Sequence, residues 1–350
     1  MANPTIKRIG VLTGGGDCPG LNPVIRAVVR KSCAVGLEVV GIKNGWKGLV
    51  ENDTIPLDMQ SVSGIVHRGG TILNTSRTNP YKDPKQLAAV KENYQKLKLD
   101  ALIAIGGEDT LGVANKLVKD GFAVVGVPKT IDNDLPATEV TFGFDTALHV
   151  ATDAVDRLHT TAESHHRVMV IEVMGRDTGW IALHAGLAGG ADVILIPEIP
   201  FTIENICEAI RQRELSGRKF SLVVVAEGAR LPKKDARGKL IPTATPGNVA
   251  STIAYSLRES LRKEVRVTVL GHVQRGGSPS PFDRILATRF GVRAVDLVAR
   301  GEFGRMVCLR AGKIESVSLE EAIGVCKTVD PNGDHVRAAR AVGITFGDRP

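Results

Sequence analysis

The 350-residue chain has few aromatic residues, few cysteines and no long apolar run. Its 9 Phe, 2 Trp and 3 Tyr are too few to build the aromatic platforms on which single-stranded nucleic acids stack. The five cysteines are scattered and form no Cys-x-x-Cys pair, which is typical of reduced thiols in a cytoplasm and not of a zinc site or a disulfide framework. The longest apolar runs, such as Ala101–Ile105, are far shorter than the ~20 residues that span a bilayer.

The amino-terminal residues lead directly into an apolar run and do not have the layout of a signal peptide. We therefore expect neither secretion nor membrane insertion, and we predict a cytoplasmic protein. The sequence also contains no Gly-Lys-Ser or Gly-Lys-Thr, so a P-loop is excluded.

Glycine and basic residues are abundant. The chain has 38 Gly, and 45 Lys and Arg against 38 Asp and Glu give a net charge of +7. The glycines indicate many tight turns and close backbone approaches. The positive charge suits either a nucleic-acid surface or pockets for small anions. Because Lys and Arg form no long run, we favour small anions and expect no nucleic-acid partner.

Short β-branched apolar runs alternate with helical patterns along the chain. In the first repeat a strand at Ile9–Thr13 precedes a glycine-rich turn, Asn22 is placed to cap a helix that starts at Pro23, and Gly36 ends that helix. Continuous apolar strands between helices indicate an α/β fold with parallel sheets covered on both faces. Residues Gly228–Asn248 break the pattern and indicate a surface excursion. The other predicted strands are Val39–Ile42, Ala101–Ile105, Ala123–Val127, Arg167–Val173, Val193–Ile196, Ser221–Ala226 and Arg266–Leu270.

Polar clusters follow six of the predicted strands. Ligands of open α/β sheets bind outside the carboxyl ends of the strands, so these clusters predict one large polar site. The clusters are Gly14–Asp17, Gly106–Thr110, Pro128–Asp134, Met174–Asp177, Glu227–Gly228 and Gly271–Gly277.

Three of these clusters carry residues suited to phosphate chemistry. The amides of Gly14–Asp17 can cradle a phosphate at a helix start, although an ordinary tight turn has the same pattern. Glu108 and Asp109 fit a Mg²⁺–phosphate site, or they complement a helix dipole. Asp132 and Asp134 would repel each other without a nearby cation or a hydroxyl to deprotonate. A solvated acidic turn is the structural alternative.

Histidine and arginine residues give weaker signals. His165 and His166 are adjacent and have no third ligand at metal spacing, so we interpret them as structural or substrate-lining. Five arginines suit bidentate phosphate recognition or surface ion pairs. They are Arg77, Arg167, Arg176, Arg266 and Arg275.

Six motifs together resemble the 6-phosphofructokinase family. In chain order they are GGGDCPGLN, RGGTILNTSR, IGGEDT, PKTIDNDL, VMGRDTGW and VTVLGHVQRGGSPSPFDR. The resemblance implies the phosphofructokinase fold, two Rossmann-like α/β lobes with the active site between them. Residues 1–143 with about 277–305 are then expected to form the donor-phosphate lobe. Residues 144–276 with about 306–327 are expected to form the fructose 6-phosphate lobe, and residues 328–350 a carboxyl-terminal tail.

The resemblance also implies roles for individual residues. Asp132 matches the general base that deprotonates the 1-hydroxyl of the sugar, and Asp134 supports the same loop. Glu108 matches the Mg²⁺ ligand, and Gly15 and Arg77 match donor-phosphate contacts. The remaining matches to the fructose 6-phosphate site are Thr130, Met174, Gly175, Arg176, Glu227, His272 and Arg275.

Two arginines imply an oligomer. Arg167 and Arg266 match residues that reach into the site of a neighbouring subunit, so the resemblance implies a homo-oligomer, a dimer or tetramer, with shared active sites. Arg176 matches a position near the transferred phosphoryl group.

Two positions indicate the phosphoryl donor. Asp109 and Lys129 are the pair found in family members that use inorganic diphosphate, whereas ATP-dependent members have Gly at both positions. A carboxylate at 109 would occupy and charge the space that the α-phosphate of a nucleotide needs, and Lys129 offers a compact cation to a short donor. We therefore predict reversible, Mg²⁺-dependent phosphoryl transfer from diphosphate to fructose 6-phosphate, with Asp132, Asp109, Lys129 and Arg176 as catalytic residues. The alternatives are an ATP-dependent 6-phosphofructokinase and a non-catalytic sugar-phosphate-binding subunit.

Overall fold

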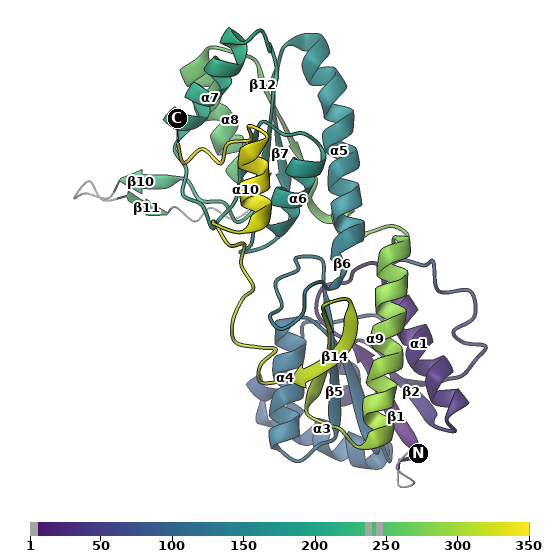
Figure 1. Ribbon diagram of the computed structural model, residues 1–350. Helices are drawn as coiled ribbons and strands as arrows, with labels where there is room; N and C mark the ends of the chain where they lie inside the picture. The colour runs from purple at the N-terminus through teal and green to yellow at the C-terminus, as the bar shows by residue number, and fades with distance from the viewer. Residues whose placement is uncertain (1–5, 235–239, 243–247, 350) are drawn as a thin grey trace. The chain divides into compact units, whose positions relative to one another are not determined.

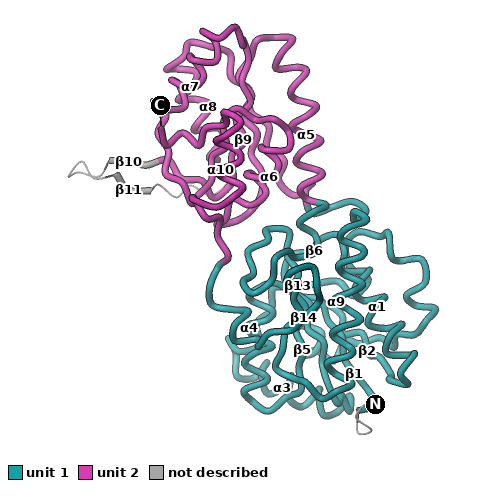
Figure 2. Tube along the Cα trace, in the orientation of Figure 1, with its two compact units in different colours: residues 1–146, 275–326 teal, residues 147–274, 327–350 magenta. Residues whose placement is uncertain are grey.

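The computed structural model describes residues 6–234, 240–242 and 248–349. The chain forms two compact units, which Figure 2 shows in different colours. Unit 1 contains residues 1–146 and 275–326, and unit 2 contains residues 147–274 and 327–350. The chain therefore passes between the units three times.

Unit 1 is built on an eight-stranded sheet with the order β14-β13-β5-β4-β1-β2-β3, in which β6 also pairs with β5 (Figure 1). The inner strands are parallel. The edge strands β3 and β14 run antiparallel to their neighbours, so the predicted parallel sheet of this unit has one antiparallel strand at each edge. Only the turn Ala311–Gly312 separates β13 from β14, and so short a turn permits only an antiparallel pair. The strands are β1 (Arg8–Thr13), β2 (Glu38–Ile42), β3 (Thr54–Leu57), β4 (Ala101–Gly106), β5 (Val124–Thr130), β6 (Phe142–Gly143), β13 (Arg305–Arg310) and β14 (Lys313–Ser318).

Helices cover both faces of this sheet. On one face α1 packs against α9, where Gly291 lies close to Val24 and Ala27. On the other face α2, α3 and α4 bury a core that includes Trp46 and Leu111. The helical elements are α1 (Leu21–Ala34), α2 (Trp46–Glu51), η1 (Pro80–Lys82), α3 (Pro84–Lys96), α4 (Glu108–Lys119) and α9 (Pro281–Arg300).

The first helix begins one residue before the sequence predicts its cap. Helix α1 starts at Leu21 with Gly20 as its cap residue, so the prediction that Asn22 caps the helix is wrong. The Asn22 amide instead donates to the carbonyl oxygens of Arg68 and Gly69 at 3.1 and 3.2 Å, and its oxygen accepts from the amide of Ile72 at 2.8 Å. These long-range bonds hold the loop at Arg68–Ile72. They use the side-chain atoms with which Asn22 would otherwise cap the helix.

Unit 2 contains a four-stranded sheet with the order β12-β7-β9-β8, in which all pairs are parallel. Helices α7 and α8 bury one face in a core that includes Ile206 and Ile253, and α6 packs against β8 and β9. The elements are α5 (Phe144–His165), β7 (Val168–Val173), α6 (Trp180–Ala188), β8 (Val193–Leu195), α7 (Ile203–Leu215), β9 (Ser221–Ala226), β10 (Pro232–Lys234), β11 (Leu240–Pro242), α8 (Val249–Leu261), β12 (Val265–Val269), η2 (Gly271–Arg275) and α10 (Asp334–Ala341).

All eight strands that the sequence predicts are present. The predicted surface excursion contains the antiparallel pair β10–β11, while residues 235–239 and 243–247 of it lie outside the described residues. In the part of the chain that the structure describes, no helix is long and apolar enough to cross a membrane.

The predicted division of the carboxyl-terminal third is wrong in two places. Residues 306–326 belong to unit 1, because β13 pairs with β5 and β14 pairs with β13. The expected tail after residue 327 belongs to unit 2. There the backbone of Thr345 forms a parallel bridge with Val193 of β8, so this segment continues the second sheet.

Candidate active site

A small pocket lies at the carboxyl end of β1, where the glycine-rich turn begins. Gly15 adopts a φ of 81°, which favours glycine, and its amide donates to the carbonyl oxygen of Ser76 at 3.1 Å. The pocket has a volume of about 90 Å³, and its lining includes Gly15, Arg77, Lys82 and Asp109. The structure thus brings together three of the predicted donor-binding residues, Gly15, Arg77 and Asp109.

Two carboxylates lie at the start of α4 beside this pocket. Glu108 and Asp109 occupy the first turn of the helix, and both are exposed. Asp109 lines the pocket, and Glu108 precedes it in the chain. Among the described residues no group of three or more His, Cys, Asp or Glu side chains is arranged to hold a metal ion. These oxygens can therefore hold Mg²⁺ only in the way common for substrate-linked Mg²⁺, through one or two carboxylates, waters and phosphate oxygens.

Lys129 lies behind the glycine-rich turn and not among the residues that line the pocket. Its side chain is 3% exposed, and its ammonium group donates to the carbonyl oxygen of Gly16. Burial lowers the pKa of Lys129, while the carboxylates of Asp132 and Asp134 favour its charged form. The ammonium group therefore links the turn after β1 to the acidic loop after β5.

The loop after β5 is buried and held by hydrogen bonds. Asp132 is 2% exposed. The hydroxyl of Thr130 accepts from the amide of Asp132 at 3.0 Å and donates to its carboxylate at 3.3 Å. The side-chain oxygen of Asn133 accepts from the amide of Thr141 at 3.2 Å, and the hydroxyl of Thr141 donates to the carbonyl oxygen of Thr130 at 2.8 Å. The loop fixes the backbone around Asp132, as a general base requires.

Arg275 belongs to unit 1 together with these residues. Its guanidinium donates to the carbonyl oxygen of Asp17 at 3.3 Å, and a Cβ at Gly16 would lie 2.8 Å from its Nη1 atom. The guanidinium also lies close enough to Lys129 to disfavour the charged form of that lysine. Two cations therefore face the same glycine-rich turn, which suits an anion.

A second group of predicted residues lies at the carboxyl ends of β7 and β9 in unit 2. The amide of Arg176 donates to the Glu227 carboxylate at 2.9 Å. Arg176 has a φ of 51° and Gly175 a φ of 144°. A Cβ at Gly228 would lie 2.0 Å from the carbonyl oxygen of Arg176, so only glycine fits there. These contacts bring Gly175, Arg176 and Glu227 together and leave the guanidinium of Arg176 exposed.

Gln274 supports this group and was not singled out as a site residue from the sequence. It is fully buried. Its side-chain oxygen accepts from the amide of Met174 at 3.2 Å, and its amide nitrogen donates to the carbonyl oxygen of Gly271 at 3.0 Å. Its place inside the GHVQRGG motif was the available signal. His272, two residues earlier, is exposed.

Arg167 and Arg266 lie apart from the other predicted residues of unit 2. Glu264 binds both, and its carboxylate accepts from Arg167 Nε at 2.8 Å. The Arg167 hydrogen bond lowers the pKa of Glu264. Arg167 precedes β7, whereas Met174 follows this six-residue strand, so about 20 Å separates the two ends. The two arginines therefore form a pair of their own at the amino ends of β7 and β12.

The fold and these contacts define an α/β protein in which buried and exposed cations surround a glycine-rich turn beside carboxylates. Residues 8–298 match the model of the family described as Phosphofructokinase. The chain belongs to the phosphofructokinase family and is a transferase of that family.

Its relatives carry two kinds of name. The chain is 56% identical over 334 residues to a pyrophosphate–fructose 6-phosphate 1-phosphotransferase of Amycolatopsis methanolica, covering 93% of this chain and 96% of that protein. It is 50% identical over 362 residues to ATP-dependent 6-phosphofructokinase 2 of Clostridium perfringens, covering 98% and 99%. Its fold resembles the crystal structure of a pyrophosphate-dependent phosphofructokinase from Nitrosospira multiformis, with a TM-score of 0.83 and 23% identity over 98% of this chain and 93% of that one.

Proposed function

We propose that the protein transfers a phosphoryl group from inorganic diphosphate to the 1-hydroxyl of fructose 6-phosphate, giving fructose 1,6-bisphosphate and phosphate. The observation that carries this proposal is the pocket lined by Gly15, Arg77, Lys82 and Asp109. Its volume of about 90 Å³ is well below the ~300 Å³ at which pockets for larger organic ligands begin. Two cations and a glycine turn suit a short polyanion.

The Asp109 carboxylate supports diphosphate over ATP. An extra phosphate charge held ~4 Å from this carboxylate meets a repulsion of ~4 kcal/mol at the effective dielectric constant of a protein surface. ATP has a third phosphate group, the α-phosphate, next to the two that diphosphate also has. Diphosphate lacks this third group and therefore avoids its repulsion by Asp109. Lys129 offsets part of the negative charge around the donor, because its ammonium group lies near Asp132 and Asp134.

In the proposed reaction Asp132 accepts the proton of the 1-hydroxyl, and Thr130 orients its carboxylate. Gly15 and Arg77 hold the donor, and the ammonium group of Lys129 supports the glycine-rich turn from behind. Arg176 is assigned to the phosphoryl group, and Glu227 holds its backbone. Mg²⁺ would be held by Glu108 at the start of α4 and would neutralise phosphate charge. Most of the catalysis is then positioning and charge stabilisation.

The remaining roles complete the proposal. Unit 1 binds the donor phosphate, and unit 2 binds fructose 6-phosphate through Met174, Gly175, Arg176, Glu227 and His272. Thr130, Asp134 and Arg275, which belong to unit 1, are assigned to the sugar by the family motifs. The pair Arg167 and Arg266 would serve the site of a neighbouring subunit in a homo-oligomer, because the pair lies at the opposite end of β7 from the other sugar-site residues. Cys18, Cys33, Cys207 and Cys308 form no disulfide bond, which agrees with the reducing cytoplasm where we place the protein.

An ATP-dependent reaction is the second candidate, because relatives at 50–53% identity are named as ATP-dependent enzymes. An aldolase-coupled assay with diphosphate and ATP in parallel separates the two. We expect turnover with diphosphate and little with ATP. Turnover with ATP alone would refute the proposal, and no turnover with either donor would favour a non-catalytic sugar-phosphate-binding subunit.

Two substitutions sharpen this test. In Asp109→Gly with Lys129→Gly we expect diphosphate kcat/KM to fall and ATP kcat/KM to rise by roughly 100-fold, since a repulsion of several kcal/mol is removed. Asp334→Gly is the matched control, because it also removes an acidic residue from the first turn of a helix. Unchanged diphosphate kinetics in the double variant would show that the pocket is not the donor site.

A further inference from the structure

A large cavity of unit 2 is lined by none of the residues of the proposed reaction, although Asp177 of its lining follows Arg176 in the chain. It has a volume of about 760 Å³ and begins directly after β8, at Ile196. Ligands of parallel sheets bind at this end of the strands, and the volume lies within the ~300–1,000 Å³ that small-molecule sites occupy. Arg176, Glu227 and His272 do not line it.

The wall of this cavity is mostly apolar and is well packed from behind. Ile196, Ile199 and Phe201 contribute side chains that are only 1%, 4% and 1% exposed. Pro197, which is half-buried, and Pro200, which is exposed, give the cavity its accessible apolar surface in front of them. Such a surface suits a compact apolar body, because it can be covered without leaving a polar group unpaired. The cavity therefore favours an organic molecule over a bare inorganic ion.

Glu198 lines the cavity, and its carboxylate connects two segments of the chain. One carboxylate oxygen accepts from the amides of Gly179 and Val329 at 3.0 and 2.9 Å. The other oxygen is buried without a hydrogen-bond partner among the described residues. Burial raises the pKa of Glu198.

A second cavity of about 550 Å³ adjoins the first and shares Glu198, Ile199 and Asp348 with it. Arginines outnumber carboxyl groups around the two cavities by four to three. The arginines are Arg230, Arg337, Arg340 and Arg349, and the acidic residues are Asp177, Glu198 and Asp348. An anion is therefore favoured at the rim.

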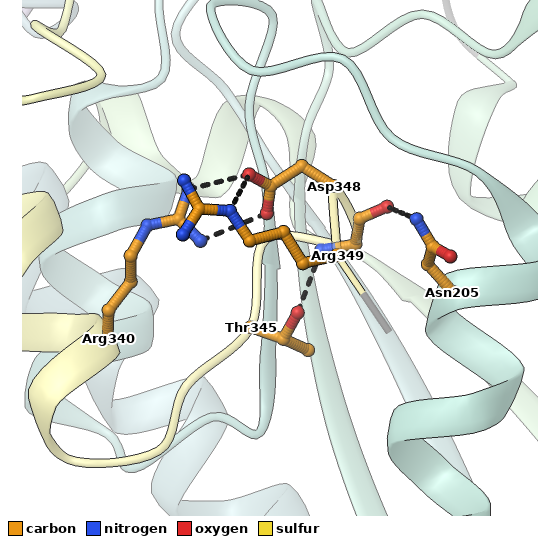
Figure 3. A network of polar contacts seen from close by, with 6 residues as sticks. Asn205, Arg340, Thr345, Asp348 and Arg349 are labelled. Carbon is orange, nitrogen blue, oxygen red and sulfur yellow. Dashed lines mark hydrogen bonds and ion pairs between the residues drawn. The ribbon is translucent and has the colours of Figure 1, made fainter.

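The rim arginines differ in how firmly they are held. Figure 3 shows the carboxylate of Asp348 facing the guanidinium groups of both Arg340 and Arg349. Arg340 makes two bonds to it, at 3.0 and 2.8 Å. Arg349 lies 3.7 Å from Asp348 and is 76% exposed, and Arg230 lies 3.8 Å from Asp177 and is 50% exposed. These two arginines can turn to an incoming phosphate or carboxylate at little cost.

The carboxyl-terminal segment that carries Asp348 is fixed in place. The carbonyl oxygen of Gly347 accepts from the amide of Thr202 at 3.0 Å and from the side chain of Asn205 at 3.2 Å, and Gly347 donates to the Thr345 hydroxyl at 3.1 Å (Figure 3). These bonds fix the part of the cavity wall that carries Asp348, and a rigid wall lowers the cost of binding.

We propose that unit 2 carries a second small-molecule site, after β8, for an organic anion with an apolar body against Pro197 and Pro200 and a phosphate or carboxylate group at Arg230 or Arg349. The site goes beyond the proposed reaction and does not depend on it.

The proposal is tested with 1-naphthyl phosphate and 1-naphthoate, titrated calorimetrically into the full chain with fructose 6-phosphate in excess. We expect one molecule to bind per chain, whereas inorganic phosphate and 1-naphthol, which each lack one part, bind at least 10-fold more weakly. The better of the two anions identifies the head group.

Variants locate the binding. Ile199→Trp fills the cavity and should abolish binding, and Arg230→Ala with Arg349→Ala should weaken it about 10-fold or more. Arg157→Ala, which removes a 77% exposed arginine of α5, should leave it unchanged. The arginine variants alter exposed side chains, so they remain informative if Ile199→Trp does not fold. No binding of either anion, or equal binding by the wild type and the double arginine variant, would overturn the proposal.

Discussion

Replacing Asp283 by Asn should change how the stability of unit 1 depends on pH. Asp283 is fully buried at the start of α9. Its carboxylate accepts from the amide and the hydroxyl of Thr146 at 2.8 and 2.6 Å, and the Ser280 amide donates to that hydroxyl at 2.9 Å. Burial raises the pKa of Asp283 from 3.8 to about 6. The carboxyl group therefore joins the starts of α5 and α9, where the chain leaves and re-enters unit 1.

The sign and size of the effect follow from the two pKa values. Below about pH 4 the carboxyl group is protonated in both states. Between about pH 4 and 6 the folded state keeps a proton that the unfolded state has released, so the free energy of unfolding falls as the pH rises. The full loss is present above about pH 6. A difference of about two pH units corresponds to ~3 kcal/mol, and the carboxyl group has no exposed area that would reduce it.

The measurement uses the two tryptophans of the chain, since Trp46 lies in unit 1 and Trp180 in unit 2. In a Trp180→Phe background, urea unfolding followed by the fluorescence of Trp46 reports on unit 1. We expect the free energy of unfolding of the Asp283→Asn variant, relative to the parent with Asp283, to rise by about 3 kcal/mol between pH 4 and pH 7. Asp334→Asn, at a side chain 89% exposed, should show no such change. Parallel pH curves for the parent and the Asp283→Asn variant would refute the reasoning.

Three further predictions concern the proposed reaction. Asp132→Asn should lower kcat by about 10²–10⁴ with an unchanged melting temperature, as expected for a lost general base, and a fully active variant would contradict that role. Glu227→Gln weakens the charged acceptor of the Arg176 amide and should raise KM for fructose 6-phosphate by roughly 10-fold while KM for diphosphate stays constant, so steady-state kinetics with each substrate varied would expose an equal effect on both. Gly228→Ala places a Cβ 2.0 Å from the carbonyl oxygen of Arg176 and should abolish turnover and lower the melting temperature. Gly217→Ala is the comparison, because its Cβ meets nothing within 4 Å and only the backbone at a φ of 90° is strained.

Much of the fold could be predicted because its strands are local features of the sequence. The eight predicted strands, such as β4 and β9, are short apolar runs, and in these two every residue is buried. Continuous burial leaves a continuous apolar pattern. The polar clusters could be placed because each follows such a run. Edge strands such as β14 were missed, since their alternating exposure resembles a loop that contains a few apolar residues.

The sequence named individual candidate site residues, but it did not predict the hydrogen bonds between them. Met174 and Gln274 are 100 residues apart in the chain, and Lys129 is 113 residues from Gly16, whose carbonyl oxygen it binds. No local pattern encodes such a pair, because the energy of a hydrogen bond between distant residues exists only after both have been brought together.

The sequence by itself therefore determined which segments are buried strands, and which glycines and charged residues follow them, because burial and turn chemistry act over a few neighbouring residues. Only the tertiary structure decided the partners. In the folded chain the ammonium group of Lys129 binds the carbonyl oxygen of Gly16, and Glu264 binds both Arg167 and Arg266. The last residues of the chain join the second sheet. The tertiary structure also enclosed the cavity after β8, whose walls come from segments that meet only when unit 2 has folded.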